Sequence, residues 1–195
     1  MQQSKLTHSD LYKLEDYANL RDSMRSEVME EKKRRRIAVG PNLTLIFENR
    51  MTIQYQIQEM LRIERIFEAD AIQEELDAYN PLIPDGSNWK ATAMVEYPDV
   101  EERRAKLQLL KGIEDLIWVQ VGDFDRVYAI ADEDLERSNE EKTSAVHFLR
   151  FELPDSNVEA ARAGAQIRVG VRHLHYDYTI TVDDASRDSL AADLG

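Results

Sequence analysis

The stretch that decides the fold runs from Leu43 to Asn80 and reads LTLIFENRMTIQYQIQEMLRIERIFEADAIQEELDAYN. Its first five residues (43–47) place Leu43, Leu45 and Phe47 at alternate positions, which is typical of a strand with one buried face. From Ile53 onward the apolar residues recur at helical spacing as far as Asn80, and Pro81 is expected to end the helix because proline disfavours helical geometry in the residue before it. We therefore predict a strand followed by one long amphipathic helix.

Polar side chains interrupt this helical pattern on its apolar side. If Ile53 is set at zero and each residue advances by about 100°, Glu64 falls near the middle of the apolar stripe and Glu68 one turn further. An ionised carboxylate is costly to bury unless it is paired or binds a metal. We call the surrounding set the polar motif, and it consists of Glu48, Arg50, Gln56, Glu59, Arg62 and Glu64. Glu64 is either a ligand or acid/base group, or the partner of a nearby arginine.

Composition narrows the classes of protein that the chain can belong to. The 195 residues suit one domain, 1–195, and the 43% hydrophobic content allows a sizeable core. Cysteine is absent, which excludes disulfides, thiolate catalysis and cysteine-ligated zinc or iron–sulfur sites. No apolar run approaches the roughly 18 residues that a membrane span needs, and the first ten residues do not resemble a signal peptide. We expect a soluble, cytoplasmic protein.

The charge of the chain is strongly negative, with a formal net value of −13. Duplex nucleic acid is an unsuitable partner, because binding there depends on cations that neutralise phosphates. The negative charge instead favours solubility or the attraction of a basic partner protein. Five consecutive cations (32–36) close a predicted amphipathic helix over residues 15–36. They either stabilise the carboxyl end of that helix or bind an anion or an acidic partner.

The second half of the chain is predicted to consist mainly of strands. Short helices are expected from Asp99 to Gly112 and from Asn157 to Ala163, a charged loop over 132–142, and a final surface helix whose last residues fray. The strands are expected at 89–97, 117–121, 126–131, 145–153 and 166–182, the last with a bend near 173–177. The predicted class is α+β, with N-terminal helices packed on a mainly antiparallel sheet. The single predicted domain consists of a mainly helical half (1–80), a half that is mainly antiparallel sheet (88–182) and a tail (183–195).

Histidines and a carboxylate near the end of the chain suggest a metal site. If residues 173–177 stay extended, His173, His175 and Asp177 share one face and offer ligands for iron, manganese or zinc. The expected bend weakens that geometry, and the wet face of an ordinary strand has the same pattern. His147 shares its strand face with Leu149 and Phe151, so it is either a hydrogen-bonded core residue or a ligand beside Glu64 or His173. No nucleophile motif such as Gly-x-Ser-x-Gly occurs.

Several segments resemble an uncharacterised bacterial family known as a domain of unknown function. The similar segments are GPNLTLIFENRMTIQYQIQEMLRIE (40–64), YNPLIP (79–84), WKATAMVEY (89–97), VHFLRFEL (146–153) and VRHLHYDY (171–178). The resemblance implies genes that often lie beside a rubrerythrin and a cysteine-rich iron–sulfur oxidoreductase, and hence a role near peroxide or redox metabolism. It supplies no catalytic residues.

Three hypotheses follow for the function. The leading one is a non-catalytic accessory protein that binds an iron–sulfur oxidoreductase or a rubrerythrin-like protein. The second is a metal-binding protein or metal-dependent enzyme in which Glu64 meets His147 or the histidines at 173 and 175, between the long helix and the sheet. The third is a small-ligand pocket around Arg50, Arg62 and Glu59.

Overall fold

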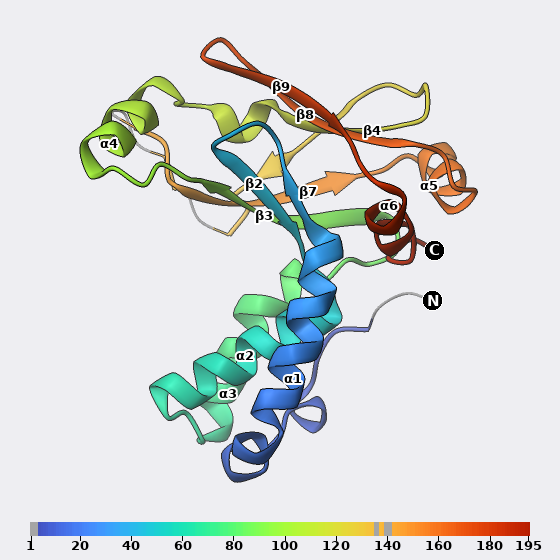
Figure 1. The fold of residues 1–195 in the computed structure, drawn as a ribbon. Coiled ribbons are helices and arrows are strands. Elements are labelled where there is room, and N and C mark those ends of the chain that lie inside the picture. Colours follow the sequence, from blue (N-terminus) through green and yellow to red (C-terminus); the bar gives the residue numbers. More distant parts are fainter. Residues whose placement is uncertain (1–3, 135–136, 139–141) are drawn as a thin grey trace.

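A computed structural model describes residues 4–134, 137–138 and 142–195 of the chain. Figure 1 shows two β-sheets packed together at one end of the molecule and three helices that project from them. These helices, which we call the helical arm, are α1 (Leu14–Arg35), α2 (Arg50–Glu64) and α3 (Ala69–Tyr79). The predicted α+β class with antiparallel strand pairing is confirmed.

The strands form two antiparallel sheets where the sequence indicated one. Sheet A has the order β1-β2-β3-β7-β6 and sheet B the order β5-β4-β8-β9. The strands of sheet A are β1 (Arg36–Ala38), β2 (Leu43–Phe47), β3 (Asn88–Val95), β6 (Ile130–Ala131) and β7 (Val146–Glu152). Those of sheet B are β4 (Ile117–Val121), β5 (Val127–Tyr128), β8 (Ile167–His173) and β9 (Tyr176–Thr181).

The main apolar core lies between the two sheets, because alternate side chains of each strand point toward the other sheet. The predicted returning strand over 126–131 is divided: β5 pairs with β4, whereas β6 pairs with β7 in the other sheet. At the opposite edge the Tyr176 hydroxyl donates to the Val39 carbonyl oxygen at 2.9 Å and accepts from the Asn42 amide at 2.8 Å. The sandwich is therefore tied together along both edges.

The long helix predicted from Ile53 to Asn80 is broken in the structure. Arg65 adopts left-handed geometry with φ of 57°, and α2 ends there before α3 begins at Ala69. The amide nitrogens of Arg65 and Ile66 both donate to the Leu61 carbonyl oxygen, which closes the helix end. The longest helix is α1, and its predicted inward face is only partly right, because Tyr17 and Val28 are buried while Leu20 is 38% exposed.

The arm has an apolar cluster of its own, separate from the core between the sheets. Its buried members are Leu6, Ile53, Ile57, Leu61, Leu76 and Ile83. Short 3-10 helices η1 (His8–Asp10) and η2 (Asn80–Leu82) flank it. The remaining helical elements surround the sandwich, and they are α4 (Val100–Leu109), η3 (Ile113–Leu116), α5 (Asp155–Arg162) and α6 (Asp184–Ala191).

The C-terminal residues are packed rather than frayed, contrary to the sequence-based expectation. Helix α6 follows Asp183, whose carboxylate accepts from the Ser186 amide at 2.9 Å. Asp193 and Leu194 are 2% and 3% exposed. Asp193 is held by Arg35, a buried member of the cation run at 32–36.

Arg35 turns inward, and Lys33, Arg34 and Arg36 also form ion pairs within the protein. The Arg35 guanidinium donates to the carbonyl oxygens of Phe47 at 2.9 Å and Glu48 at 3.2 Å. Lys33 and Arg34 pair with acids one turn earlier on α1. The described contacts therefore give this run a structural role. Within the described residues no helix has the length and apolarity needed to cross a bilayer.

Candidate functional site

A groove runs between the helical arm and the face of sheet A that points away from sheet B. Its floor is a row of three side chains aligned across the sheet: Ile46 of β2, Thr92 of β3 and Phe148 of β7. In the next row Lys90 lies opposite Arg150. We call this hollow the arm groove. The strand alternation that sends Leu149 and Phe151 into the core places Phe148 and Arg150 on this outer face.

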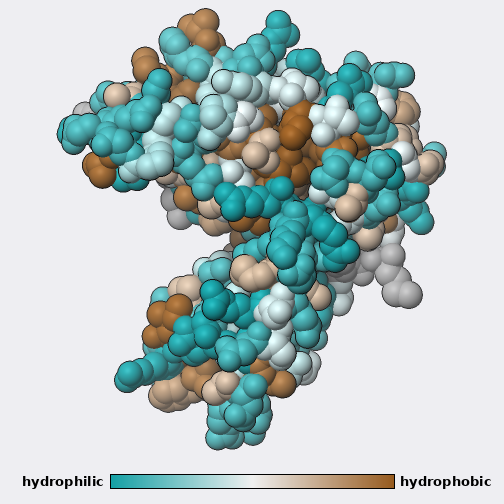
Figure 2. All heavy atoms as spheres, viewed as in Figure 1, coloured by the Kyte–Doolittle hydropathy of each residue, from teal (hydrophilic) through white to brown (hydrophobic). Residues whose placement is uncertain are grey.

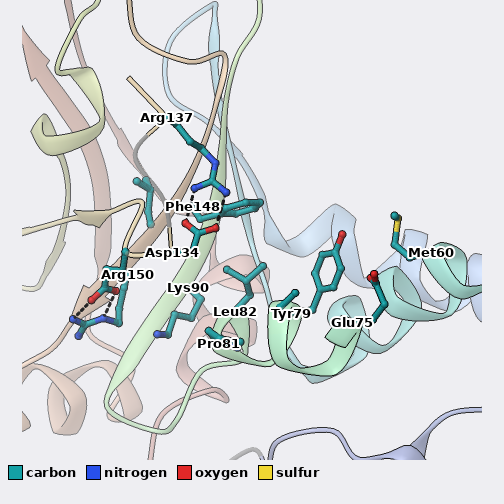
Figure 3. A pocket seen from close by; sticks show the side chains of 13 residues that line it. Met60, Glu75, Tyr79, Pro81, Leu82, Lys90, Asp134, Arg137, Phe148 and Arg150 are labelled. Carbon is teal, nitrogen blue, oxygen red and sulfur yellow. Dashed lines mark hydrogen bonds and ion pairs between the residues drawn. The ribbon is translucent and has the colours of Figure 1, made fainter. Parts of the chain in front are cut away.

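Two adjoining pockets make up the arm groove. The larger has a volume of about 340 Å³ and lies between α3, η2 and the side chains of Glu133, Asp134 and Arg137 (Figure 3). The smaller, of about 240 Å³, shares Tyr79, Leu82 and Phe148 with the larger. The larger pocket is at the low end of the range usual for small-molecule sites.

The three cations that line the larger pocket differ in their partners. Arg150 donates to the two carboxylate oxygens of Glu133 at 2.8 and 2.9 Å. Arg137 donates to those of Asp134 at 2.5 and 2.7 Å. Lys90 has no carboxylate within ion-pair distance among the residues that the structure describes.

The pocket also changes the acidity of its side chains. Burial, with a smaller contribution from the Arg150 guanidinium, lowers the pKa of Lys90. Burial raises the pKa of Glu75, and the neighbouring carboxylates of Glu64 and Glu74 raise it further. Burial likewise raises the pKa of the Tyr79 hydroxyl. The environment therefore disfavours the charged form of each group.

Two residues of the polar motif line the arm groove. Glu48 is 8% exposed, and its carboxylate accepts from the Thr52 hydroxyl at 2.6 Å and the Thr92 hydroxyl at 2.8 Å. Gln56 lines the smaller pocket beside Glu48. The hydroxyl donors satisfy the Glu48 carboxylate, which explains how the fold accommodates an acid there.

The other members of the polar motif lie elsewhere. Arg50, at the start of α2, donates to Asp10 at 2.5 Å and to the Ser4 carbonyl oxygen at 3.1 Å. Arg62, near the end of the same helix, donates to Glu59 at 3.3 Å. Twelve helical residues separate the two arginines by roughly 18 Å, so the predicted pocket around Arg50, Arg62 and Glu59 is not formed.

Glu59 of α2 forms hydrogen bonds with two side chains of α1. It accepts from Arg21 at 2.8 and 2.9 Å and from the Tyr17 hydroxyl at 2.7 Å. These contacts, led by the Arg21 hydrogen bonds and opposed by burial, lower the pKa of Glu59 to about 2. Because the folded-state pKa is below the ordinary value of 4.5, the stabilisation is present above pH 4.5 and is lost as the pH falls toward 2.

We expect Glu59→Gln to lower the free energy of unfolding at neutral pH by about 1–2 kcal/mol, a value reduced for solvent screening of the Arg21 side. The variant should also lose less stability than the wild type between pH 4.5 and pH 2. Urea unfolding at several pH values measures both effects. Glu74→Gln on the exposed face of α3 is the matched control and should change stability by less than about 0.5 kcal/mol. Parallel pH profiles for wild type and Glu59→Gln would contradict this assignment.

Glu64 does not occupy a buried stripe. It is the last residue of α2 and is exposed, because the left-handed Arg65 ends the helix and turns the following residues away. Phe67, whose helical spacing from Ile53 would place it on the same stripe, is 70% exposed, and Glu68 is exposed as well. The expected site between Glu64 and a histidine of the sheet is therefore not formed.

His147 is a hydrogen-bonded residue of the sandwich interior. It is 1% exposed; its Nδ1 lies 2.6 Å from an Asp132 oxygen and its Nε2 lies 2.9 Å from the Thr143 hydroxyl. Glu114 approaches Nε2 to 3.7 Å. Burial alone would raise the pKa of Glu114, but hydrogen bonds from Ser138 and Thr143 outweigh it and hold the pKa below its ordinary value. Sequence reasoning did not identify Asp132 or Glu114 as neighbours of His147.

The histidines at 173 and 175 lie at a hairpin, as the predicted bend required. β8 ends at His173 and β9 begins at Tyr176, so Asp177 pairs with Arg172 across the hairpin. The two imidazole rings are 5.7 Å apart, and His173 Nε2 lies 3.2 Å from the Lys111 carbonyl oxygen. In the described parts of the chain no three His, Asp or Glu side chains are grouped so as to hold a metal ion. The predicted charged loop at 132–142 is only partly covered, since 135, 136 and 139–141 lie outside the described residues.

The far end of the helical arm carries acids and exposed apolar side chains together. We call this surface the arm tip, and its residues are Ile63, Glu64, Phe67, Glu68, Asp70 and Glu74. Ile63 is 61% exposed and Phe67 70% exposed. In the described structure none of the four carboxylates at the arm tip has a cation within ion-pair distance. Figure 2 shows brown apolar spheres among teal hydrophilic ones on the arm.

Of the groove residues that were not predicted, only Phe148 could have been recognised from the sequence. Phe148 is a large aromatic residue on the strand face opposite His147, where a half-buried strand normally carries polar residues. Lys90 and Arg150 look like ordinary solvated positions until β3 and β7 are known to pair.

Comparison with known proteins places these observations in a family. A solved crystal structure, described as a novel protein of unknown function from Burkholderia pseudomallei K96243, is 51% identical with a TM-score of 0.94. The match covers 98% of this chain and 100% of that one. No match to a curated protein was found. The family model described as "Protein of unknown function (DUF3501)" matches residues 5–194. The chain therefore belongs to the DUF3501 family.

Proposed function

We propose that this protein is a non-catalytic accessory protein that docks, through the arm tip, on a redox protein with a basic surface. The observation that carries the proposal is the combination of exposed Phe67 and Ile63 with carboxylates that have no ion-pair partner among the described residues, all at the end of the arm. Exposed aromatic and aliphatic residues within a charged rim are typical of protein interaction sites.

Charge decides which kind of partner fits the arm tip. The carboxylates of Glu64 and Glu74 both raise the pKa of Glu75, so they already repel further negative charge at neutral pH. A partner that brings lysine or arginine side chains relieves this repulsion, whereas an acidic partner increases it. The formal net charge of −13 extends the same preference over longer distances.

The identity of the partner rests on the family resemblance of the sequence. That resemblance implies neighbouring genes for a rubrerythrin and a cysteine-rich iron–sulfur oxidoreductase. A chain without cysteine cannot hold a cysteine-ligated cluster, so electrons in such a system pass through the neighbour. We therefore propose one of these two proteins as the docking partner.

Binding kinetics of the purified chain with each candidate partner test the proposal. The association rate should fall steeply as salt is raised from roughly 50 to 500 mM, because exposed charges are then screened within a few ångströms. The double change Glu64→Lys/Glu74→Lys should slow association by roughly tenfold or more.

The matched control is Glu101→Lys/Glu159→Lys, which alters the net charge equally on exposed positions of α4 and α5. It should have a clearly smaller effect than the arm-tip change. Absence of binding at low salt to both candidate partners would overturn the partner assignment. Equal slowing by the two double variants would show that net charge, and not the arm tip, governs the encounter.

A further inference from the structure

We propose that the larger pocket of the arm groove binds a small organic carboxylate with an apolar body, and that the Lys90 ammonium group contacts the carboxylate. This site lies at the junction of arm and sandwich, whereas partner docking is assigned to the arm tip. The two proposals rest on different residues, so a negative result in the ligand-binding experiment would not contradict partner docking, and the reverse also holds.

The position of Lys90 is the first support. Figure 3 shows its side chain in the hollow between Arg150 on one side and Pro81 and Leu82 on the other. The residue is half-buried on the central strand β3, which fixes its backbone between β2 and β7. In the described structure the ammonium nitrogen has no hydrogen-bond acceptor or carboxylate within bonding distance.

An unpaired, partly buried cation favours an anionic ligand. Placing the ammonium away from water costs free energy that no described side chain offsets by a direct hydrogen bond or ion pair, and a ligand carboxylate would supply both. The other groups that act on Lys90 are Arg150 and three acids, namely Asp85, Glu133 and Glu152. Arg150 already donates to both Glu133 and Glu152, so these acids are partly neutralised before any ligand arrives.

The rest of the pocket suits an apolar body of limited size. Phe148 presents its ring on the floor, and Met60, Tyr79 and Leu82 line the arm side. A pocket of about 340 Å³ accommodates one ring or a short branched chain rather than a nucleotide or a long acyl chain. Glu75, whose pKa is raised by burial and by its neighbours, lies on the arm side and repels a carboxylate placed there, which favours the orientation toward Lys90.

Titration calorimetry with 3-phenylpropionate and its uncharged amide tests the site. The wild type should bind the acid at least roughly tenfold more tightly than the amide. Lys90→Met should remove that preference by weakening binding of the acid far more than binding of the amide, and Lys90→Arg should retain most of it. Lys106→Met, a lysine that lies over the Tyr97 ring outside the groove, is the matched control and should behave as wild type.

The pH dependence in the wild type provides a test that needs no variant. A carboxylate selects the charged amine, so affinity should decline as the pH rises through the Lys90 pKa, which lies below the ordinary 10.5. Lys90→Arg should show no such decline. Equal binding of acid and amide by the wild type, or an acid preference that survives Lys90→Met, would overturn the proposal.

Discussion

Arg35→Met is expected to lower the free energy of unfolding by about 3–5 kcal/mol, as is usual when one partner of a buried ion pair is removed. Arg35 is 1% exposed and contacts Asp193, which is 2% exposed. Without the guanidinium, the Asp193 carboxylate stays buried and loses this ion pair. The carbonyl oxygens of Phe47 and Glu48 lose their donors as well. Urea unfolding of wild type and variant measures the difference.

A neighbouring arginine and a compensating change provide the controls. Arg34 is 55% exposed and pairs with Glu31 on the same turn of α1, so Arg34→Met should cost less than about 1 kcal/mol. Adding Asp193→Leu to Arg35→Met removes the buried carboxylate that lost its arginine and should restore part of the lost stability. Equal effects of Arg34→Met and Arg35→Met would refute the role assigned to the buried guanidinium.

Gly170→Ala is expected to destabilise the sandwich by about 3 kcal/mol, near the upper end of overpacking effects. A Cβ atom at this position in β8 would lie 2.3 and 2.7 Å from two atoms of the Trp118 indole and 2.8 Å from the Tyr178 carbonyl oxygen. Trp118 is 1% exposed, so its ring has little room to move. Thermal or urea unfolding measures the loss.

A double-mutant cycle separates this clash from any general effect of alanine. Phenylalanine has no counterpart of the nearer indole atom, Cζ2, so Trp118→Phe should make Gly170→Ala less harmful than it is in the wild type. Gly112→Ala, where a Cβ meets nothing within 4 Å, should cost only about 1 kcal/mol for its left-handed backbone. Additive effects of the two changes in the cycle would exclude the predicted contact.

The strands were predictable because local alternation reports the burial of one face. For this reason the predicted strand at 89–97 covers all of β3 except Asn88, and those at 117–121 and 145–153 contain β4 and β7. The break at Arg65 was not predictable, since no glycine or proline marks it and an arginine takes the left-handed position. Glu64 was predicted on the buried stripe because the predicted helix continued past Arg65.

The division into two sheets and the arm groove depend on contacts between distant residues. The segment from Val127 to Ala131 gives no local sign that its halves pair with different sheets. Lys90, Phe148 and Tyr79 belong to three separate elements and meet only once the arm packs near sheet A. Local periodicity carries no information on contacts between residues that are distant in the sequence. The polar motif, which lies in one continuous stretch, could therefore be recognised from the sequence, whereas the pocket could not.

The order of the chain through the arm limits how the protein can be divided. Strands β1 and β2 of sheet A lie between α1 and α2 in the sequence, so the chain leaves the arm, forms part of the sandwich and returns. A cut in the segment between η2 and β3 would take these two strands away with the helices and leave β3 as an uncovered sheet edge. Neither piece would then hold a complete set of strands, so arm and sandwich must be made as one chain.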